Sequence, residues 1–119
     1  MCRSTKVVVR LFVCILGIGF ASRVSVGAVL INEFLAANSS TLADPQGQFD
    51  DWVELYNSGD AEVDVGGMYL TDDPESPTKW RIPQGLSNLT RISAKGLLII
   101  WLDGDTTDSG LHASFGLDA

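Results

Sequence analysis

Short runs of alternating hydrophobic and polar residues cover positions 29–119, and turn-forming residues separate them. In residues 52–56, Val53 and Leu55 fall on one face of an extended chain, as expected for a strand with one face in a core. The most apolar run, residues 97–102, is continuous, which predicts a strand buried on both faces. The other extended runs that we predict are residues 29–36, 62–65, 68–71, 80–82 and 112–117.

Turn signals recur along this part of the chain about every eight to twelve residues. They include residues 57–60, Gly66-Gly67 and residues 103–105. No run shows the 3.6-residue period of an amphipathic helix. Frequent turns between short strands favour an all-β sandwich.

The first 28 residues have a different pattern, which predicts a cleaved secretory signal peptide. Basic residues precede an apolar run at 11–21, and the small residues of Val26-Gly27-Ala28 form the cleavage site, with a weaker site after Ala21. A spanning helix needs about 20 apolar residues, and Arg10 and Arg23 bound this run too closely for that. We therefore expect a secreted or cell-surface protein with no membrane contact after cleavage.

Cleavage after Ala28 would leave 91 of the 119 residues, enough for one small domain over residues 29–119. Both cysteines, Cys2 and Cys14, would leave with the signal peptide. Four of the eight basic residues lie before position 29, whereas all fifteen acidic residues follow it, so the mature chain would carry a net charge of −11. This charge excludes binding to nucleic acid, which requires clustered Lys and Arg. It suits cations or basic partners.

The ordered set of motifs in this chain resembles the lamin tail domain of bacterial secreted proteins. The matching segments, in order, are VLINEF (29–34), DPQG (44–47), DWVELYN (51–57), VDVGGMYLTDD (63–73), KWRIP (79–83), GLLIIW (96–101) and LHASFGL (111–117).

This resemblance implies an immunoglobulin-like β-sandwich that acts as a binding or structural module and is not an enzyme. Similar bacterial domains accompany the catalytic domains of secreted or surface proteins. In nuclear lamins the fold is a docking platform, but nothing in this sequence indicates a nuclear role. The family pattern continues with further strands beyond a segment like SFGLDA, so we expect the domain to be C-terminally incomplete at Ala119.

Two acidic loops are candidates for binding calcium, the one cofactor that the sequence suggests. Calcium takes six to eight oxygen ligands from flexible loops. The first loop offers Asp44, Asp50 and Asp51 around Gly47, although its spacing is not that of an EF-hand. The second, weaker candidate is the loop with Asp103, Asp105 and Asp108. The alternative for both is a solvated turn.

Other chemistry is poorly supported. Asp51 and Glu54 could be a glycosidase-like carboxylate pair, but no cleft motif accompanies them. His112, the only histidine, is expected to be an ordinary strand residue, because zinc usually takes four ligands from Cys, His and carboxylates. Trp101 is expected in the core. Trp52, Glu54 and Tyr56 share one strand face and form a candidate surface for a protein or carbohydrate.

The function that we expect is therefore non-catalytic adhesion or domain docking at the cell surface. Two alternatives are an accessory domain of a secreted hydrolase whose catalytic part lies elsewhere, and a calcium-stabilised structural domain.

Overall fold

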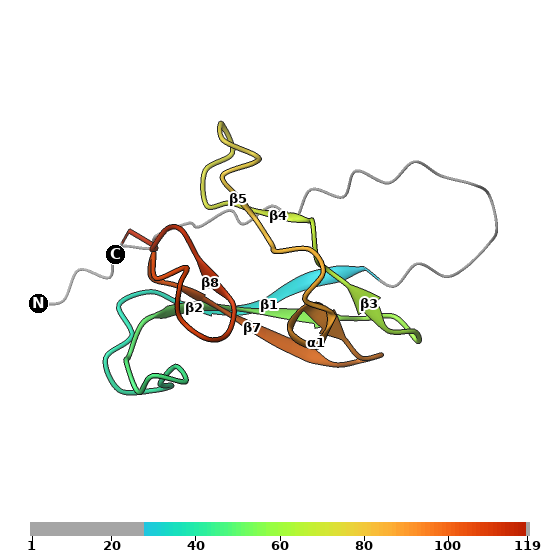
Figure 1. The fold of residues 1–119 in the computed structure, drawn as a ribbon, viewed down its shortest axis with the longest axis horizontal. Coiled ribbons are helices and arrows are strands. Elements are labelled where there is room, and N and C mark those ends of the chain that lie inside the picture. Colours follow the sequence, from blue (N-terminus) through green and yellow to red (C-terminus); the bar gives the residue numbers. More distant parts are fainter. Residues whose placement is uncertain (1–27, 119) are drawn as a thin grey trace, which may run out of the picture.

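The computed structural model describes residues 28–118, where the chain is built almost entirely of short strands (Figure 1). Strands dominate because β-branched and aromatic residues alternate with polar ones and turns interrupt every run. The elements are β1 (Val29–Leu35), β2 (Asp51–Asn57), β3 (Val63–Asp64), β4 (Tyr69–Leu70), β5 (Trp80–Arg81), α1 (Ser87–Thr90), β6 (Arg91–Ile92), β7 (Leu97–Leu102) and β8 (His112–Ala113).

The largest sheet has the strand order β1-β2-β7-β8. β2 lies antiparallel between β1 and β7, and β8 pairs parallel to the end of β7. A register shift between Ile31 and Glu33 places a β-bulge in the edge strand β1. Such a bulge interrupts the exposed edge of a sheet, which hinders pairing with other chains.

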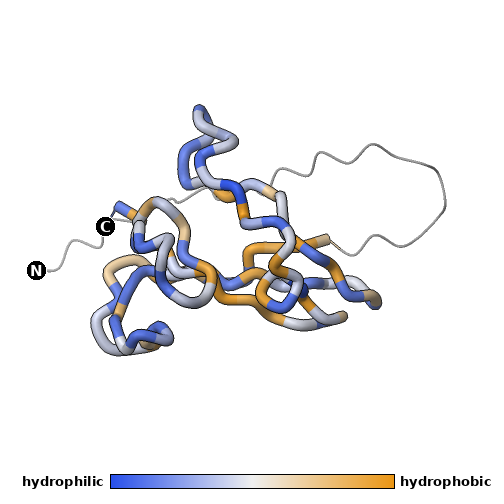
Figure 2. The backbone as a smooth tube through the Cα atoms, in the orientation of Figure 1, coloured by the Kyte–Doolittle hydropathy of each residue, from blue (hydrophilic) through white to orange (hydrophobic). Residues whose placement is uncertain are grey.

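Two short strand pairs, β3-β6 and β4-β5, form the second layer. Further backbone hydrogen bonds extend each pair: Val65 N–H donates to the Thr90 carbonyl (2.9 Å) next to β3-β6, and Ile82 N–H donates to the Met68 carbonyl (2.8 Å) next to β4-β5. In Figure 2 the hydrophobic segments gather where the two layers meet, and the loop tips are hydrophilic. The core between the layers contains Val53, Leu55, Val65, Leu70, Ile82, Ile92, Ile100 and Leu102, each at most 1% exposed.

The prediction of an all-β, immunoglobulin-like sandwich is thus confirmed. The expected positions of Val53 and Leu55 in the core and of Trp101 among the buried residues are confirmed as well. The six predicted strands that precede or follow residues 52–56 all appear, though several are shorter than expected. β6 and the single helical turn α1 were not predicted, because neither carries a periodic pattern long enough to detect.

One prediction about β7 is wrong. Its continuous apolar run indicated burial on both faces, yet Leu97 is 55% exposed and Ile99 is only partly buried, while Ile100 is fully buried. The second layer covers one face of the sheet, which we call the inner face. The other, outer face is covered only near the ends of β7 and β2 that carry Trp101 and Trp52.

The outer face therefore has two different halves. At one end Trp52 pairs with Trp101, and Trp101 with His112, and these three residues are at most 7% exposed. At the other end Leu30, Tyr56 and Leu97 lie side by side on adjacent strands. Leu30 is 48% exposed and Leu97 is 55% exposed.

The predicted signal peptide, residues 1–28, lies outside the described residues except for Ala28, as do Cys2, Cys14 and the last residue, Ala119. No helix within residues 28–118 is long and apolar enough to cross a membrane.

Candidate functional site

Two loops meet at the end of the main sheet where β1 finishes and β2 begins (Figure 1). One loop connects β1 to β2 over residues 36–50, and the other connects β7 to β8 over residues 103–111. The Gln46 side chain joins them directly, because its Nε2 donates hydrogen bonds to the Ser109 carbonyl (3.2 Å) and to Ser109 Oγ (3.0 Å). Residues far apart in the sequence are thus brought to one place.

Polar side chains of its own residues hold the first loop closed. Asn38 is buried, and its Nδ2 donates to the carbonyls of Leu42 (2.6 Å) and Asp50 (3.0 Å). Asp44 Oδ1 accepts hydrogen bonds from the backbone N–H groups of Gln46 (2.9 Å) and Gln48 (2.7 Å). These bonds fix the direction in which the Asp44 carboxylate points.

The second loop begins with a tight turn at Asp103-Gly104-Asp105. Asp103 Oδ1 accepts a hydrogen bond from the Asp105 N–H (2.9 Å), and the Gly104 N–H donates to the Ala113 carbonyl (2.9 Å). Gly104 has φ of +84°, a conformation that favours glycine. This turn places the Asp103 side chain beside His112 of β8.

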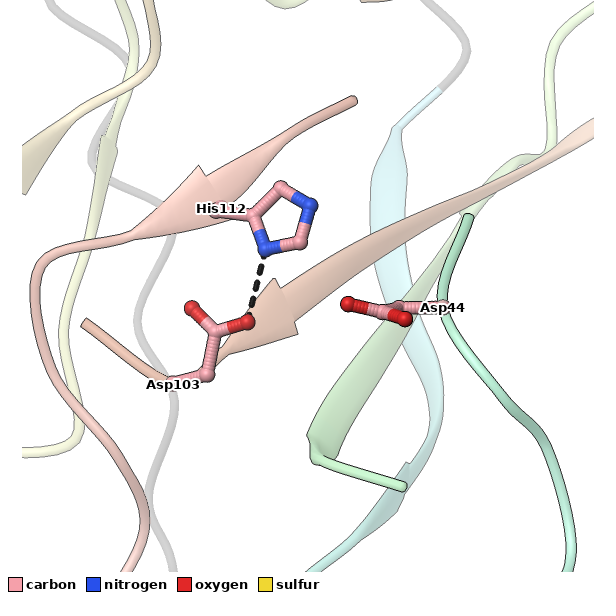
Figure 3. A group of neighbouring side chains, drawn as sticks. All are labelled: Asp44, Asp103 and His112. Atoms are coloured by element: carbon pink, nitrogen blue, oxygen red, sulfur yellow. Dashed lines mark hydrogen bonds and ion pairs between the residues drawn. The ribbon is translucent and has the colours of Figure 1, made fainter. Parts of the chain in front are cut away.

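Asp44, Asp50, Asp103 and His112 form what we call the Asp–His cluster. His112 Nδ1 lies 2.6 Å from Asp103 Oδ2, and one side-chain ligand atom from each of Asp44, Asp103 and His112 lies within 4.8 Å of the other two. Figure 3 shows the Asp44 carboxylate facing the Asp103–His112 pair from the opposite loop. Asp44 is 6% exposed and His112 is 4% exposed, so the cluster is largely closed off from water.

Two carboxylate oxygens of this cluster are buried without a hydrogen-bond partner among the described residues: Asp44 Oδ2 and Asp50 Oδ2. Burial raises the pKa of the Asp50 carboxyl group, and the negative charges of Asp103, Asp44 and Asp105 raise it further. Buried polar atoms are nearly always hydrogen-bonded in folded proteins, so two orphaned carboxylate oxygens in one region are a marked departure.

His112 compensates only part of this charge. Burial by itself would lower the pKa of His112, but the hydrogen bond and negative charge of Asp103 outweigh it and raise the pKa above its usual value. His112 Nε2 lies 3.2 Å from the Ser109 carbonyl, so both ring nitrogens have partners. Even with His112 protonated, one positive charge against three carboxylates would leave an excess of negative charge.

No lysine or arginine of residues 28–118 neutralises that excess. All four basic side chains there contact other groups: Lys79 pairs with Asp72, Arg91 with Glu62 and Lys95 with Asp60, while Arg81 Nη2 donates to Gln84 Oε1.

From the sequence, the two loops were predicted as two separate candidate sites. In the fold they lie together and contribute to one site. Asp44 of the first loop lies close to Asp103 of the second, and Asp50 feels the charge of both. Asp51 stands apart, because its two oxygens accept hydrogen bonds from the N–H groups of Ala37 (2.7 Å) and Leu117 (3.1 Å). His112 does lie in a strand, as expected, but its role in the cluster was missed; the parallel pairing of β8 with β7 that brings it there has no signal in a single sequence.

The carboxylate pair Asp51 and Glu54 does not have the geometry of a glycosidase. Side chains alternate along β2, so Asp51 points to the inner face and Glu54 to the outer face. Two carboxylates on opposite faces of a strand cannot flank one bond.

The candidate binding surface is also revised. Tyr56 and Glu54 are partly exposed on the outer face as predicted, but Trp52 is only 6% exposed, so it does not belong to an open surface. The exposed apolar neighbours of Tyr56 are Leu30 and Leu97.

A separate cavity of about 380 Å³ lies between α1 and the loop 106–112, and His112 borders it. Its walls are mostly apolar, formed by residues such as Trp80, Leu86 and Leu89.

Two packed β-layers with an all-antiparallel centre define an immunoglobulin-like module. The family can now be stated: a model of the Lamin Tail Domain family matches residues 23–119, most of the chain, so this protein belongs to the lamin tail domain family. The domains of this family are non-catalytic, immunoglobulin-like modules of the structural or binding kind. Neither the curated proteins nor the solved structures gave a match.

Proposed function

We propose that this chain is a secreted, non-catalytic module that docks to a protein partner at the cell surface through the outer face of its main sheet. Membership of the lamin tail domain family supports a binding or structural role. The N-terminal pattern of residues 1–28 supports export. The observation that carries the proposal is the exposed apolar row of Leu30, Tyr56 and Leu97, which we call the outer patch.

The outer patch crosses three strands. Leu30 pairs with Tyr56, and Tyr56 with Leu97, so the three side chains stand next to one another on the same face. Leu30 and Leu97 each leave about half of their surface in water. Adjacent apolar side chains on an open sheet face, with a tyrosine among them, are typical of protein interaction sites.

Acidic groups adjoin the outer patch and indicate the chemistry of the partner. Glu33 pairs with Glu54 on the neighbouring row, and Glu54 Oε1 accepts a hydrogen bond from Asn32 Nδ2 (2.7 Å). A protein surface with apolar side chains flanked by lysine or arginine would complement this arrangement. The same negative charge opposes contact with nucleic acid.

Site-specific photo-crosslinking in the native host tests the docking role. A photoreactive side chain at position 97 should give one adduct of defined mass, and the adduct should disappear when Leu30→Lys is added. The control is the same probe at Thr107, an exposed position on the opposite loop. Equal adducts at both positions, or none at position 97, would refute docking through the outer patch.

Amino-terminal sequencing of the exported protein tests secretion independently. The mature chain should begin at Val29, because cleavage is expected after Ala28. Exported protein that retains Met1 would contradict it.

A further inference from the structure

We infer that the Asp–His cluster is a binding site for one divalent transition-metal cation of the zinc type, held by Asp44, Asp103 and His112, with the negative charge of Asp50 close by. This site is separate from the outer patch and does not depend on the docking role. The cation would join the loop 36–50 to the loop 103–111.

Charge and hydrogen bonding point to a cation. Asp44 is 6% exposed, one of its oxygens is fixed by the N–H groups of Gln46 and Gln48, and the other, Oδ2, is buried without a partner. Asp50 Oδ2 is in the same state, and no hydrogen bond to either oxygen of the Asp50 carboxylate occurs within residues 28–118. Leaving buried charges unpaired is costly, and a bound cation would remove that cost for both oxygens at once.

The spread of the ligand atoms fits a single small ion. Zinc binds carboxylate oxygen and imidazole nitrogen at about 2.0–2.2 Å, so two ligand atoms of a tetrahedral site lie about 3.3–3.6 Å apart. The ligand atoms of Asp44, Asp103 and His112 lie within 4.8 Å of one another, and His112 Nδ1 is 2.6 Å from Asp103 Oδ2. A bound ion would therefore replace the Asp103–His112 hydrogen bond, and rotation of the three side chains would bring their ligand atoms around it.

The orientation of His112 favours a transition metal over calcium. Its Nε2 faces the Ser109 carbonyl (3.2 Å), and its Nδ1 faces the carboxylates. A backbone carbonyl that accepts the N–H of one ring nitrogen and leaves the other for the metal is the usual outer-shell arrangement of a histidine ligand. Calcium requires six to eight oxygens and does not need imidazole. Mixed nitrogen and oxygen ligands suit zinc and its neighbours in the transition series.

The contact between Gln46 and Ser109 also helps to position the ligands, although neither residue is itself a proposed ligand. Gln46 Nε2 donates to Ser109, whose carbonyl also faces His112 Nε2. The loop that carries Asp44 thus also holds the residue that orients His112.

The experiment uses the full chain, freed of metal with EDTA and then dialysed. Zinc chloride is titrated by calorimetry and added in thermal unfolding, with calcium and magnesium chloride in parallel. One zinc ion should bind per chain and raise the Tm by about 10 °C or more at a hundredfold excess over Kd. Calcium and magnesium should have much smaller effects. Absence of a one-to-one zinc complex would overturn the proposal.

Variants identify the ligands. Asp44→Asn and His112→Gln should each weaken zinc binding by about 100-fold or more, at or above the effect of losing an outer-shell partner, and Asp50→Asn by about tenfold. The control is Glu75→Gln, which removes one exposed carboxylate outside the cluster and should leave the affinity unchanged. Zinc affinity unaltered in both Asp44→Asn and His112→Gln would refute the ligand set.

Visible absorption of the cobalt(II) form gives a readout that does not depend on stability. Its bands should change in His112→Gln, because an imidazole ligand is lost, and should not change in Glu75→Gln. Should Asp44→Asn fail to fold, as judged by near-UV circular dichroism, Asp50→Asn and the cobalt spectra decide the question, since Asp50→Asn removes no hydrogen bond. Calcium binding as tight as zinc, with His112→Gln silent, would show an oxygen-only site and overturn the assignment.

Discussion

The two ends of strand β2 bury polar groups in opposite ways. At the C-terminal end of β2, Asn57 is fully buried. Its Nδ2 donates to the carbonyls of Ala61 (2.7 Å), Ile92 (3.1 Å) and Ser93 (3.1 Å). Its Oδ1 accepts from the Gly59 N–H (3.0 Å). Just before its start, Asp50 joins Asp44 in a cluster of charged groups with unpartnered oxygens.

This difference separates a structural polar residue from a site with unused binding capacity. The amide of Asn57 is neutral and satisfied, and it fastens the turn after β2 to the residues around β6. Such a group rigidifies the fold and has nothing left to offer a ligand. The Asp–His cluster keeps excess charge and free acceptors, which is why only this end of the sheet supports a proposal about metal binding.

Loss of the core that both ends share should have the largest effect. Ile100 of β7 is fully buried and pairs with Val53. Ile100→Ala should lower the free energy of unfolding by about 3–5 kcal/mol, whereas Ile99→Ala on the partly covered outer face should cost less than about 2 kcal/mol. Urea unfolding followed by tryptophan fluorescence measures both; equal losses would show that the two faces of β7 are equally buried.

Asn57→Ala should cause the second-largest loss of stability. It tests the C-terminal end of β2, where the buried polar group has all its hydrogen bonds. The change leaves three backbone carbonyls without their donor, so we expect a loss of about 2–3 kcal/mol in the free energy of unfolding. The same denaturation experiment measures it. A loss below about 0.5 kcal/mol would mean that the Asn57 bonds contribute nothing beyond what water provides.

In the absence of metal, Asp50→Asn should stabilise the protein, whereas the substitutions above destabilise it. In EDTA this change relieves repulsion with Asp44 and Asp103 and breaks no hydrogen bond of the carboxylate within the described residues, so stability should rise by about 1 kcal/mol, the size of a like-charge contact at about 4 Å in water. Thermal unfolding with and without EDTA provides the measurement. Destabilisation of the metal-free protein would contradict the view that Asp50 is an uncompensated charge.

We expect the smallest effect on stability at Asp64, because its charged carboxylate already accepts two hydrogen bonds. The Thr90 hydroxyl (2.7 Å) and the Gly66 N–H (2.8 Å) donate to its Oδ1 and lower its pKa. A carboxyl group with a lowered folded-state pKa stabilises the fold above its unfolded value of 3.8, and the contribution is lost as the pH falls through the folded pKa.

Comparing the stability of wild type and Asp64→Asn as a function of pH should therefore reveal a small advantage of the wild type above about pH 4, which disappears as the pH falls through the folded pKa of Asp64. An advantage that persisted unchanged in acid, below the folded pKa, would contradict this assignment.

Much of the fold could be predicted because its cause is local. Alternation in residues 52–56 predicted which side chains of β2 face the core, and Val53 and Leu55 are fully buried. The burial of β7 was overestimated, because a continuous apolar run does not reveal how much of a sheet face a second layer covers. Leu97 and Ile99 remain partly in water for that reason.

The site was predicted only in fragments. Asp44 and Asp50 were predicted as possible ligands on one loop, and Asp103 was predicted on another. The two loops were treated as separate candidate sites. Asp51 was grouped with Asp44 by proximity in the sequence, although its oxygens serve backbone N–H groups instead. Neighbours along a chain in an extended conformation point in different directions, so sequence spacing alone does not identify a shared site.

By itself, then, the sequence determined the class of this protein: its alternating pattern, turns and ordered motifs specify a lamin tail domain, and these depend on local propensity and on burial of one strand face. Tertiary structure alone decided that Asp44, Asp103 and His112 meet, and that Trp52 is covered while Tyr56 and Leu97 are open. Those outcomes depend on which loops fold over which end of the sheet and on the parallel pairing of β8 with β7. Contacts between residues distant in sequence are set by the packing of the whole domain, and no local pattern encodes them.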